Sequence, residues 1–334
     1  MIYWRPLVQT DLSRPSGAVP LAGGPLWFSQ VERLERGRAP EVLPAAEAGA
    51  ALDALAAPRA DFAGLAMDRP RIMGILNVTP DSFSDGGRFL APQAALAQAR
   101  AMAEGAEILD IGGESTRPGA QTVAVADEIA RTAPVIAALR AAGVTATISI
   151  DTRKAPVAKA ALQAGADIVN DVAALTFDPA LGPLAAETQA PVVLMHHLGT
   201  PETMQADPRY DDVLLDVYDW LAESVARAER LGIPRSRIAV DPGIGFGKTL
   251  AHNLALIRGL SLFHGLGCPV LLGASRKRFI GTLGGAELAE ARMPGSVAVA
   301  LAGAAQGAQI LRVHDVAETR QALRLWQAIN GSRT

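Results

Sequence analysis

The chain has 334 residues, of which 49% are hydrophobic and 19% are charged, with a formal net charge of −3. This length allows one large barrel or two smaller domains around a sizeable core. The slightly negative charge, without a long basic run, disfavours bulk nucleic-acid binding. The single cysteine, Cys268, excludes an intramolecular disulfide framework and a multi-cysteine zinc site.

Membrane attachment and secretion are also disfavoured. The first fifteen residues contain no apolar core of a signal peptide, and the longest apolar stretch, around residues 296–305, is too short to span a bilayer. We therefore expect a cytoplasmic protein that binds neither membrane nor nucleic acid.

Residues 1–70 differ from the remainder of the chain. They hold eight of the 22 prolines and no lysine. Their apolar residues Trp4, Trp27 and Phe28 can dock on another surface, and the Ala-rich segment 47–66 can form a short helix. We interpret residues 1–70 as an N-terminal extension packed against the main domain.

From residue 71 onward, short apolar β-prone runs alternate with longer helical stretches, which is typical of βαβ units around a parallel sheet. The predicted strands cover residues 71–77, 108–112, 147–151, 168–172, 191–196, 238–241, 269–273 and 310–313. The predicted helices cover residues 91–105, 123–142, 155–164, 179–188, 212–231, 249–260, 295–306 and 316–329.

Eight strand–helix units over about 260 residues match the size of an α/β fold of the (β/α)8 TIM-barrel type. We therefore predict such a barrel over residues 71–332, preceded by the extension. The alternative is a doubly wound open sheet. It is less favoured because the chain has no Gly-rich dinucleotide-binding turn between strand and helix.

A barrel of this type carries its site at the C-terminal ends of its strands, and polar residues follow every predicted strand here. Asn77, Arg312 and His314 belong to the first and eighth strands, which are neighbours in a closed barrel. An amide, a guanidinium and an imidazole together suit an anionic group. Arginine binds phosphate through bidentate donors, and Mg²⁺ is usually held by few protein oxygens plus phosphates.

The other strand ends supply a mixed ring of donors and acceptors from Asp151, Asn170, Asp241 and Lys277. These groups suit a flat heterocycle with an amidine-like edge, because one carboxylate can accept two adjacent N–H donors. Simpler roles remain open at this point. Asp151 could cap the following helix, Asn170 and Asp171 could satisfy loop backbone groups, and His314 could be a structural histidine.

Two other motifs do not fit their most obvious interpretations. The segment 243–248 resembles a phosphate-binding P-loop, but the spacing requires glycine at position 242, which is Pro242. The pair His196 and His197 suggests a metal site. Adjacent strand residues point to opposite faces, however, so we do not expect metal ligation there.

The ordered motifs resemble those of one family. Residues 77–87, NVTPDSFSDGG, and residues 113–119, GESTRPG, closely resemble the two signature loops of the dihydropteroate synthases, which are pterin-binding enzymes. The resemblance continues in order through the other strand ends and covers roughly residues 71–330. It implies a folate-biosynthesis transferase that condenses 6-hydroxymethyl-7,8-dihydropterin pyrophosphate with p-aminobenzoate. The products are 7,8-dihydropteroate and pyrophosphate, and the family is a sulfonamide target.

The resemblance also implies roles for individual residues. Asn77 is expected to help hold Mg²⁺, with Arg312 and His314 on the phosphate oxygens. Asp151, Asn170, Asp241 and Lys277 are expected to bind the pterin. Thr116 is expected near the reacting end, and Arg117 on a loop that closes over the site. The p-aminobenzoate pocket is expected to be shaped by Phe83, Pro118, Phe246, Ser275 and Lys277. The resemblance further implies a homodimer.

Two positions depart from the family pattern. Ile244 stands where many members have phenylalanine, and Leu198 stands where a polar residue is expected. Neither change removes a charged site residue, so both bear on the shape of the pocket rather than on the reaction.

Two other functions share the pterin-binding positions. A pterin-binding methyltransferase is expected to lack the segment Ser115–Gly119, the pair Ser275 and Lys277, and the pair Arg312 and His314, and to need a corrinoid partner. A non-catalytic pterin binder has no need for a pyrophosphate site.

Lysine is unusually rare, at four of the 31 basic residues: Lys154, Lys159, Lys248 and Lys277. Three of them follow predicted strands, and Lys159 is expected on a helix surface. Keeping Lys277 in an arginine-biased chain suggests that a compact ammonium is required there. We therefore expect Lys277→Arg to be poorly tolerated.

Overall fold

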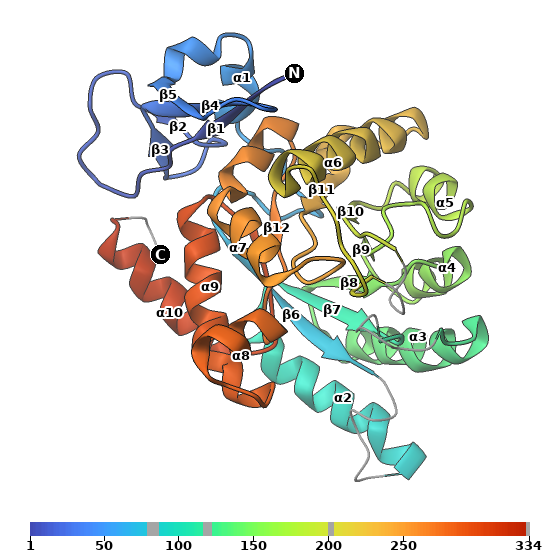
Figure 1. Cartoon of the computed structure of the whole chain (residues 1–334). Helices are drawn as coiled ribbons and strands as arrows, with labels where there is room; N and C mark the ends of the chain where they lie inside the picture. The colour runs from blue at the N-terminus through green and yellow to red at the C-terminus, as the bar shows by residue number, and fades with distance from the viewer. Residues whose placement is uncertain (79–86, 116–121, 200–203, 332–334) are drawn as a thin grey trace.

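The computed structural model describes residues 1–78, 87–115, 122–199 and 204–331, and for residues 87–94 the backbone alone. Eight parallel strands form one sheet in the order β11-β10-β9-β8-β7-β6-β13-β12, surrounded by helices (Figure 1). A parallel bridge between Val240 and Val270 joins the two ends of the sheet. The sheet is therefore a nearly closed (β/α)8 barrel, as predicted, and not an open doubly wound sheet.

The strands follow the predicted positions closely. They are β6 (Arg71–Asn77), β7 (Ile108–Gly112), β8 (Thr147–Asp151), β9 (Ile168–Asp171), β10 (Val192–Met195), β11 (Ile238–Asp241), β12 (Leu271–Leu272) and β13 (Ile310–Val313). β12 is shorter than the predicted run 269–273.

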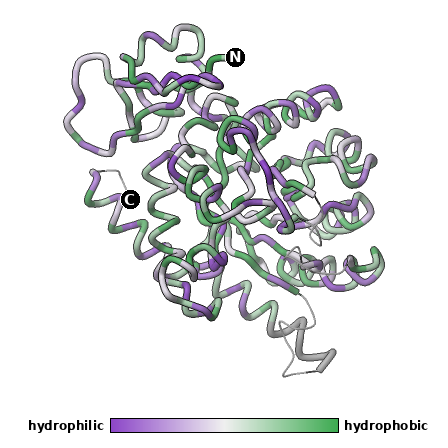
Figure 2. The backbone as a smooth tube through the Cα atoms, viewed as in Figure 1, coloured by the Kyte–Doolittle hydropathy of each residue, from purple (hydrophilic) through white to green (hydrophobic). Residues whose placement is uncertain are grey.

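The helices that follow these strands are α2 (Gly87–Ala103), α3 (Val125–Ala141), α4 (Ala155–Gln163), α5 (Leu181–Thr188), α6 (Val213–Arg230), α7 (Leu250–Arg258), α8 (Arg278–Gly284), α9 (Met293–Ala305) and α10 (Val316–Ile329). The helix α8 was not predicted. It is only seven residues long and contains Gly281 and Gly284, so it carries little helical periodicity. The hydropathy view shows hydrophilic and hydrophobic segments alternating along the outer helices (Figure 2).

The end of the barrel at the amino ends of the strands is filled by an apolar layer. Every barrel strand except β8 contributes one buried side chain to it, and the layer packs against Phe62 and Met67 from the segment that precedes β6. Phe62 is fully buried. This layer excludes water from the amino ends of the strands, so the open polar rim lies at their carboxyl ends.

The first part of the chain forms two small antiparallel sheets. One contains β1 (Ile2–Pro6), β4 (Gln30–Glu35) and β5 (Glu41–Pro44); the other contains β2 (Val19–Pro20) and β3 (Trp27–Phe28). The short helix α1 (Ala51–Ala56) lies within the segment predicted to be helical. Figure 1 shows these elements together above the barrel.

Specific contacts join these elements to the outer helices. The Tyr3 hydroxyl donates to the Asp219 carboxylate at 2.8 Å, and Arg36 pairs with Asp216 and Asp219 of α6. The Ser261 hydroxyl donates to the Pro6 carbonyl at 2.8 Å. These contacts attach the first strand to α6 and to the 3-10 helix Leu260–Leu266.

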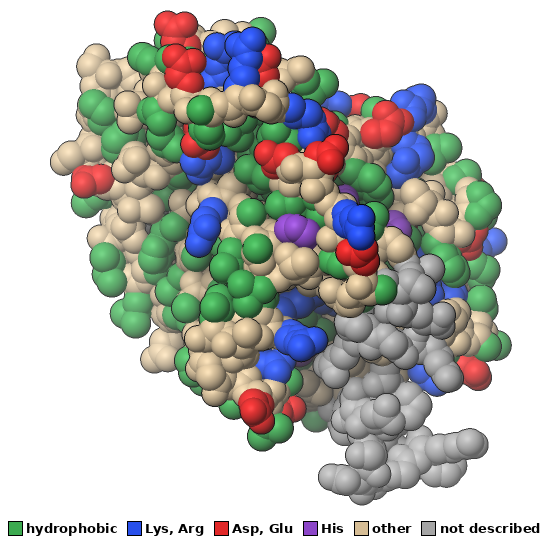
Figure 3. Space-filling view, in the orientation of Figure 1, with side chains coloured by type: hydrophobic (Ala, Val, Ile, Leu, Met, Phe, Trp, Pro, Cys, Tyr) green, Lys and Arg blue, Asp and Glu red, His purple; other side chains and the backbone are tan. Residues whose placement is uncertain are grey.

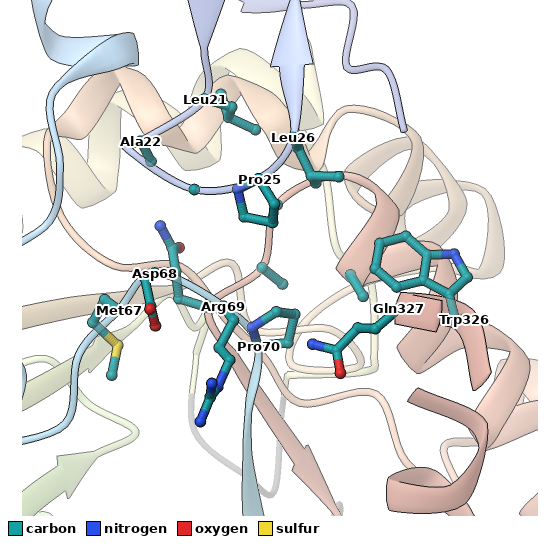
Figure 4. Close-up of a pocket in the computed structure, with 15 residues that line it drawn as sticks. Leu21, Ala22, Pro25, Leu26, Met67, Asp68, Arg69, Pro70, Trp326 and Gln327 are labelled. Carbon is teal, nitrogen blue, oxygen red and sulfur yellow. The ribbon is translucent and has the colours of Figure 1, made fainter. Parts of the chain in front are cut away.

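Two cavities of the described residues lie away from the strands' carboxyl ends. One of about 30 Å³ separates the first residues from the barrel, between Leu26, Pro70 and Trp326 (Figure 4). It has room for only about two water molecules. A second, open hollow of about 710 Å³ is lined by residues of α4, α5 and the segments that lead into β9 and β10. No helix in the described part of the chain is both long and apolar enough to cross a membrane.

The buried ring of Phe62 should contribute strongly to stability. Because it packs in the apolar layer at the base of the barrel, we expect Phe62→Ala to lower the free energy of unfolding by about 3–5 kcal/mol. Urea denaturation measures this change. Phe177→Ala is the matched control, since Phe177 is 48% exposed and should cost far less. Equal losses in the two variants would contradict the packing described here.

Candidate active site

The carboxyl ends of the barrel strands bring the predicted polar residues to one rim. Asn77, Asp151 and Asp241 are the last residues of β6, β8 and β11. The oxygens Oδ1 of Asn77 and Oδ2 of Asp151 each lie 3.8 Å from the position that a Cβ would take at Gly112. In the space-filling view, basic side chains gather beside the residues drawn in grey (Figure 3).

Arg312 is the central cation of this rim. Its Nε donates to Asp110 Oδ2 at 2.6 Å, and its Nη2 donates to Asp151 Oδ2 at 2.7 Å. These bonds use two of the five N–H donors of the guanidinium. The planar fork is therefore held by two carboxylates inside the barrel, with further donors on the same group.

Asp110 is a site residue that the sequence analysis missed. It lies in the middle of β7, is fully buried, and also accepts from Asn170 Nδ2 at 3.1 Å. A signal was present, because a carboxylate within an apolar strand is expensive unless it is paired. Asp110 also shares its strand face with Ile108 and Gly112, which places it inside the barrel.

The pKa values of this group reflect competition between burial and charge. Burial raises the pKa of Asp151 to about 7 against the opposing effect of Arg312, and Asp110 adds to the rise. Burial lowers the pKa of Arg312, but Asp110 and Asp151 outweigh it and leave the guanidinium pKa above its ordinary value. Arg312 is therefore always charged, whereas Asp151 is placed to change its charge near neutral pH.

The simpler role considered for Asp151 is wrong. The N-cap of α4 is Lys154, which makes no side-chain capping bond, and Asp151 binds Arg312 instead. Loop backbone is bound by the neighbouring residue Asp171, which accepts the N–H groups of Ala173 and Leu175 at 2.8 and 2.6 Å. Asn170 is thereby left for the interior of the barrel.

Asp241 faces the same interior from the opposite side. Its Oδ2 lies 3.4 Å from the Cβ position at Gly273, and Arg312 Cδ lies 3.8 Å from that position. Its other oxygen accepts the N–H of Gly243 at 2.7 Å. Gly243 has a φ of 68°, and a Cβ there would lie 1.9 Å from the carbonyl oxygen of His196, so only glycine fits.

Phe246 and Lys277 lie against each other on neighbouring loops. The Lys277 Nζ is 4.0 Å from the centre of the Phe246 ring, a cation–π contact. The departure at Ile244 does not enter this contact, because its side chain is fully buried in the main hydrophobic cluster. Leu198 is 38% exposed and lies against Gly247.

His314 is oriented by Ser275. The Ser275 Oγ accepts the backbone N–H of His314 at 3.2 Å and lies 3.0 Å from its Nδ1. An oxygen that already accepts the N–H can donate its own proton to Nδ1. When the hydroxyl donates in this way, the ring proton lies on Nε2, the form that donates to an anion; when Nδ1 carries the proton, the hydroxyl accepts instead.

A buried ionic network lies behind the rim and was also missed. Lys154 Nζ donates to Glu114 and Glu128 at 2.6 Å each and to the carbonyl of Val123 at the same distance. Glu114 also accepts the N–H of Val123 at 2.7 Å. Lys154 is thus a buried structural lysine rather than a substrate-facing one.

The ring of His196 is engaged by a neighbouring lysine. His196 is buried with its Nδ1 2.9 Å from Lys248 Nζ, and burial lowers the pKa values of both His196 and His197. Among the described residues, no group of three or more His, Cys, Asp or Glu side chains could hold a metal. Asn77 Oδ1 on the rim fits a cation held mainly by substrate phosphates, because Mg²⁺ commonly takes few protein ligands.

Four predicted residues cannot be placed. Phe83, Thr116, Arg117 and Pro118 lie outside the described residues. Their roles stay predictions.

Comparison with known proteins identifies the class. The model of the family described as "Pterin binding enzyme" matches residues 73–314. The chain therefore belongs to the pterin binding enzyme family.

Within that class, the similar proteins are dihydropteroate synthases. The chain is 47% identical to that of Escherichia coli over 265 residues, which are 79% of this chain and 93% of that enzyme. It is 49% identical to that of Neisseria meningitidis serogroup C over 269 residues, 79% of this chain and 94% of that enzyme.

Solved structures agree. The Xanthomonas albilineans dihydropteroate synthase with 4-aminobenzoic acid matches with a TM-score of 0.77 and 50% identity, over 83% of this chain and 99% of that chain. The complex of the same enzyme with 7,8-dihydropteroate matches with a TM-score of 0.75 and 47% identity, over 83% of this chain and all of that chain.

The raised pKa of Asp151 should make stability depend on pH. An unfolded aspartate ionises near pH 3.9, whereas Asp151 ionises at about 7, so between these values the native state keeps a proton that the unfolded state has lost. Stability should therefore fall as pH rises, by about 1.4 kcal/mol per pH unit from this group.

Asp151→Asn cannot ionise and should lack this slope. Urea titrations of both proteins at about pH 5 and about pH 6.5 measure the difference, expected at about 2 kcal/mol. Parallel behaviour of the two proteins would show that the Asp151 pKa is not raised.

Proposed function

We propose that this protein is a dihydropteroate synthase, which joins 6-hydroxymethyl-7,8-dihydropterin pyrophosphate to p-aminobenzoate and releases pyrophosphate. The observation that carries this proposal is the Arg312 guanidinium held by Asp110 and Asp151 at one barrel rim. That rim combines an anion-binding cation with carboxylates for a heterocycle. The similar proteins named above are called dihydropteroate synthases, and the solved structures contain 4-aminobenzoic acid or 7,8-dihydropteroate.

In this proposal, Asp151, Asn170, Asp241 and Lys277 bind the pterin. One buried carboxylate can accept both N–H donors of the amidine-like edge of the pterin. These hydrogen bonds are stronger in the low-dielectric interior than they would be in water. The compact ammonium of Lys277 lies on the Phe246 ring, close to Gly245, where a Cβ would approach Lys277 Cδ to 2.9 Å. A planar guanidinium at position 277 would crowd this contact.

Arg312 and His314 bind the pyrophosphate. Arg312 supplies fixed charge, and the His314 ring supplies a directed donor in the tautomer that carries its proton on Nε2. Asn77 would hold Mg²⁺ through its amide oxygen, together with the substrate phosphates. When bound, the cation neutralises the phosphate charge.

The reaction follows from these positions. The bond between the pterin methylene carbon and the pyrophosphate oxygen breaks, while Arg312 and His314 stabilise the charge that builds on the leaving group. The carboxylate of Asp151 stabilises the delocalised positive charge left on the pterin. The amine nitrogen of p-aminobenzoate then bonds to that carbon and loses a proton. Phe246 and Ser275, with Phe83, Thr116, Arg117 and Pro118, are proposed to bind p-aminobenzoate and cover the reacting end.

The rival functions are less favourable. A non-catalytic pterin binder would not need Arg312 and His314 at the rim. A methyltransferase would not need the segment Ser115–Gly119.

We also propose that residues 71–332 form the catalytic unit, that residues 1–70 support it, and that the protein is a homodimer. The contacts of Tyr3 and Arg36 with α6 support the role of residues 1–70. The exposed leucines Leu283 and Leu288, in and just after α8, support the homodimer.

The reaction is tested by pyrophosphate release from purified protein with Mg²⁺ and both substrates. We expect release that depends on p-aminobenzoate and matches the 7,8-dihydropteroate formed, mole for mole. Arg320→Ala is a suitable control variant, because Arg320 pairs with Glu107 away from the rim. Release that is independent of p-aminobenzoate would refute the synthase assignment.

A further inference from the structure

A second lysine, Lys248, is buried behind the rim. Lys248 is only 3% exposed and lies at the end of the loop that follows β11. Its Nζ is 2.9 Å from His196 Nδ1 and donates to the carbonyl of Phe246 at 2.9 Å. Lys248 therefore connects the end of β10 to the backbone of the residue whose ring meets Lys277.

The rest of this loop is held by separate partners. Asn253 Oδ1 accepts the N–H of Gly245 at 2.7 Å, and the Tyr210 hydroxyl donates to the carbonyl of Gly247 at 2.8 Å. The backbone on both sides of Phe246 is thus fixed from α7 and from the segment before α6. The Phe246 carbonyl itself is bound by Lys248.

The charges around Lys248 make this an expensive arrangement. Burial lowers the pKa of Lys248 to about 7 and keeps His196 neutral, so its Nδ1 accepts from the ammonium. Both hydrogen-bond acceptors are neutral, so these bonds do not form an ion pair that would offset the desolvation of the ammonium. Asp241 acts on Lys248 through longer-range charge. A buried ammonium with this desolvation cost indicates a role beyond packing.

We propose that Lys248 is a positioning residue that acts through Phe246 to place the ammonium of Lys277. The proposal rests on the proposed function, in which Lys277 binds the pterin. Lys248 makes no substrate contact in this scheme. It fixes the Phe246 backbone, the Phe246 ring lies 4.0 Å from Lys277 Nζ, and Lys277 is thereby held for the substrate.

The test is a double-variant cycle on the KM for the pterin pyrophosphate in the full-length enzyme. Lys248→Met and Phe246→Leu should each raise this KM by about tenfold, in line with the roughly 1.4 kcal/mol cost that one lost charge-assisted contact can carry. If Lys248 acts through Phe246, the KM of the double variant should be no higher than that of the more severe single variant. Lys159→Met is the matched control, because Lys159 is exposed on α4 and should leave the KM unchanged.

The outcomes separate a positioning role from a structural one. An unchanged KM in Lys248→Met, or changes that multiply in the double variant, would overturn the proposal even if the melting temperature falls. Should Lys248→Met fail to fold, His196→Phe removes the Nδ1 acceptor and keeps a ring against Trp220, which lies 4.9 Å away. This variant should raise the same KM, and an unchanged value would overturn the proposal. An unmodified enzyme that forms no dihydropteroate would refute the proposed function instead.

Discussion

The pairing of Arg312 with Asp110 and Asp151 is the interaction on which the site depends. Two carboxylates and one guanidinium lie inside a barrel where an unpaired charge would cost several kcal/mol. Neither carboxylate can be removed without leaving Arg312 short of a partner. The same pairing keeps the arginine charged and fixes it between two carboxylates, so in the proposed function the anion site and the pterin site share one electrostatic centre.

The remainder of the fold makes this centre possible. The apolar layer around Phe62 and Met67 closes the barrel on the amino-end side of Asp110 and keeps water from that end. The drier interior strengthens the electrostatic interactions between Asp110, Asp151 and Arg312. The parallel strands then deliver Asn77, Asp151 and Asp241 to the same rim. The lysines, rare in this chain, serve distinct roles. Lys154 joins a buried ionic network, whereas Lys277 faces the Phe246 ring.

Periodicity and motif order were sufficient to predict the barrel and most of its strand ends. The elements missed are the seven-residue α8 and all five strands of the first 44 residues, of which β2 and β3 have only two residues each. Asp110 was missed because the prediction considered only the last residues of strands. Pairing partners such as Glu114 for Lys154 could not be predicted, because they are 40 positions apart and meet only once β7 and β8 pair in the sheet.

The most direct test of this account is a double-mutant cycle between Asp110 and Arg312, measured as kcat/KM for the pterin pyrophosphate. If the two side chains act as one unit, Asp110→Asn and Arg312→Ala should each reduce kcat/KM, and the double variant should be no worse than Arg312→Ala alone. The coupling energy should then be about 1–3 kcal/mol. Losses that simply multiply, with a coupling energy near zero, would contradict the claim that Asp110 holds Arg312 for catalysis.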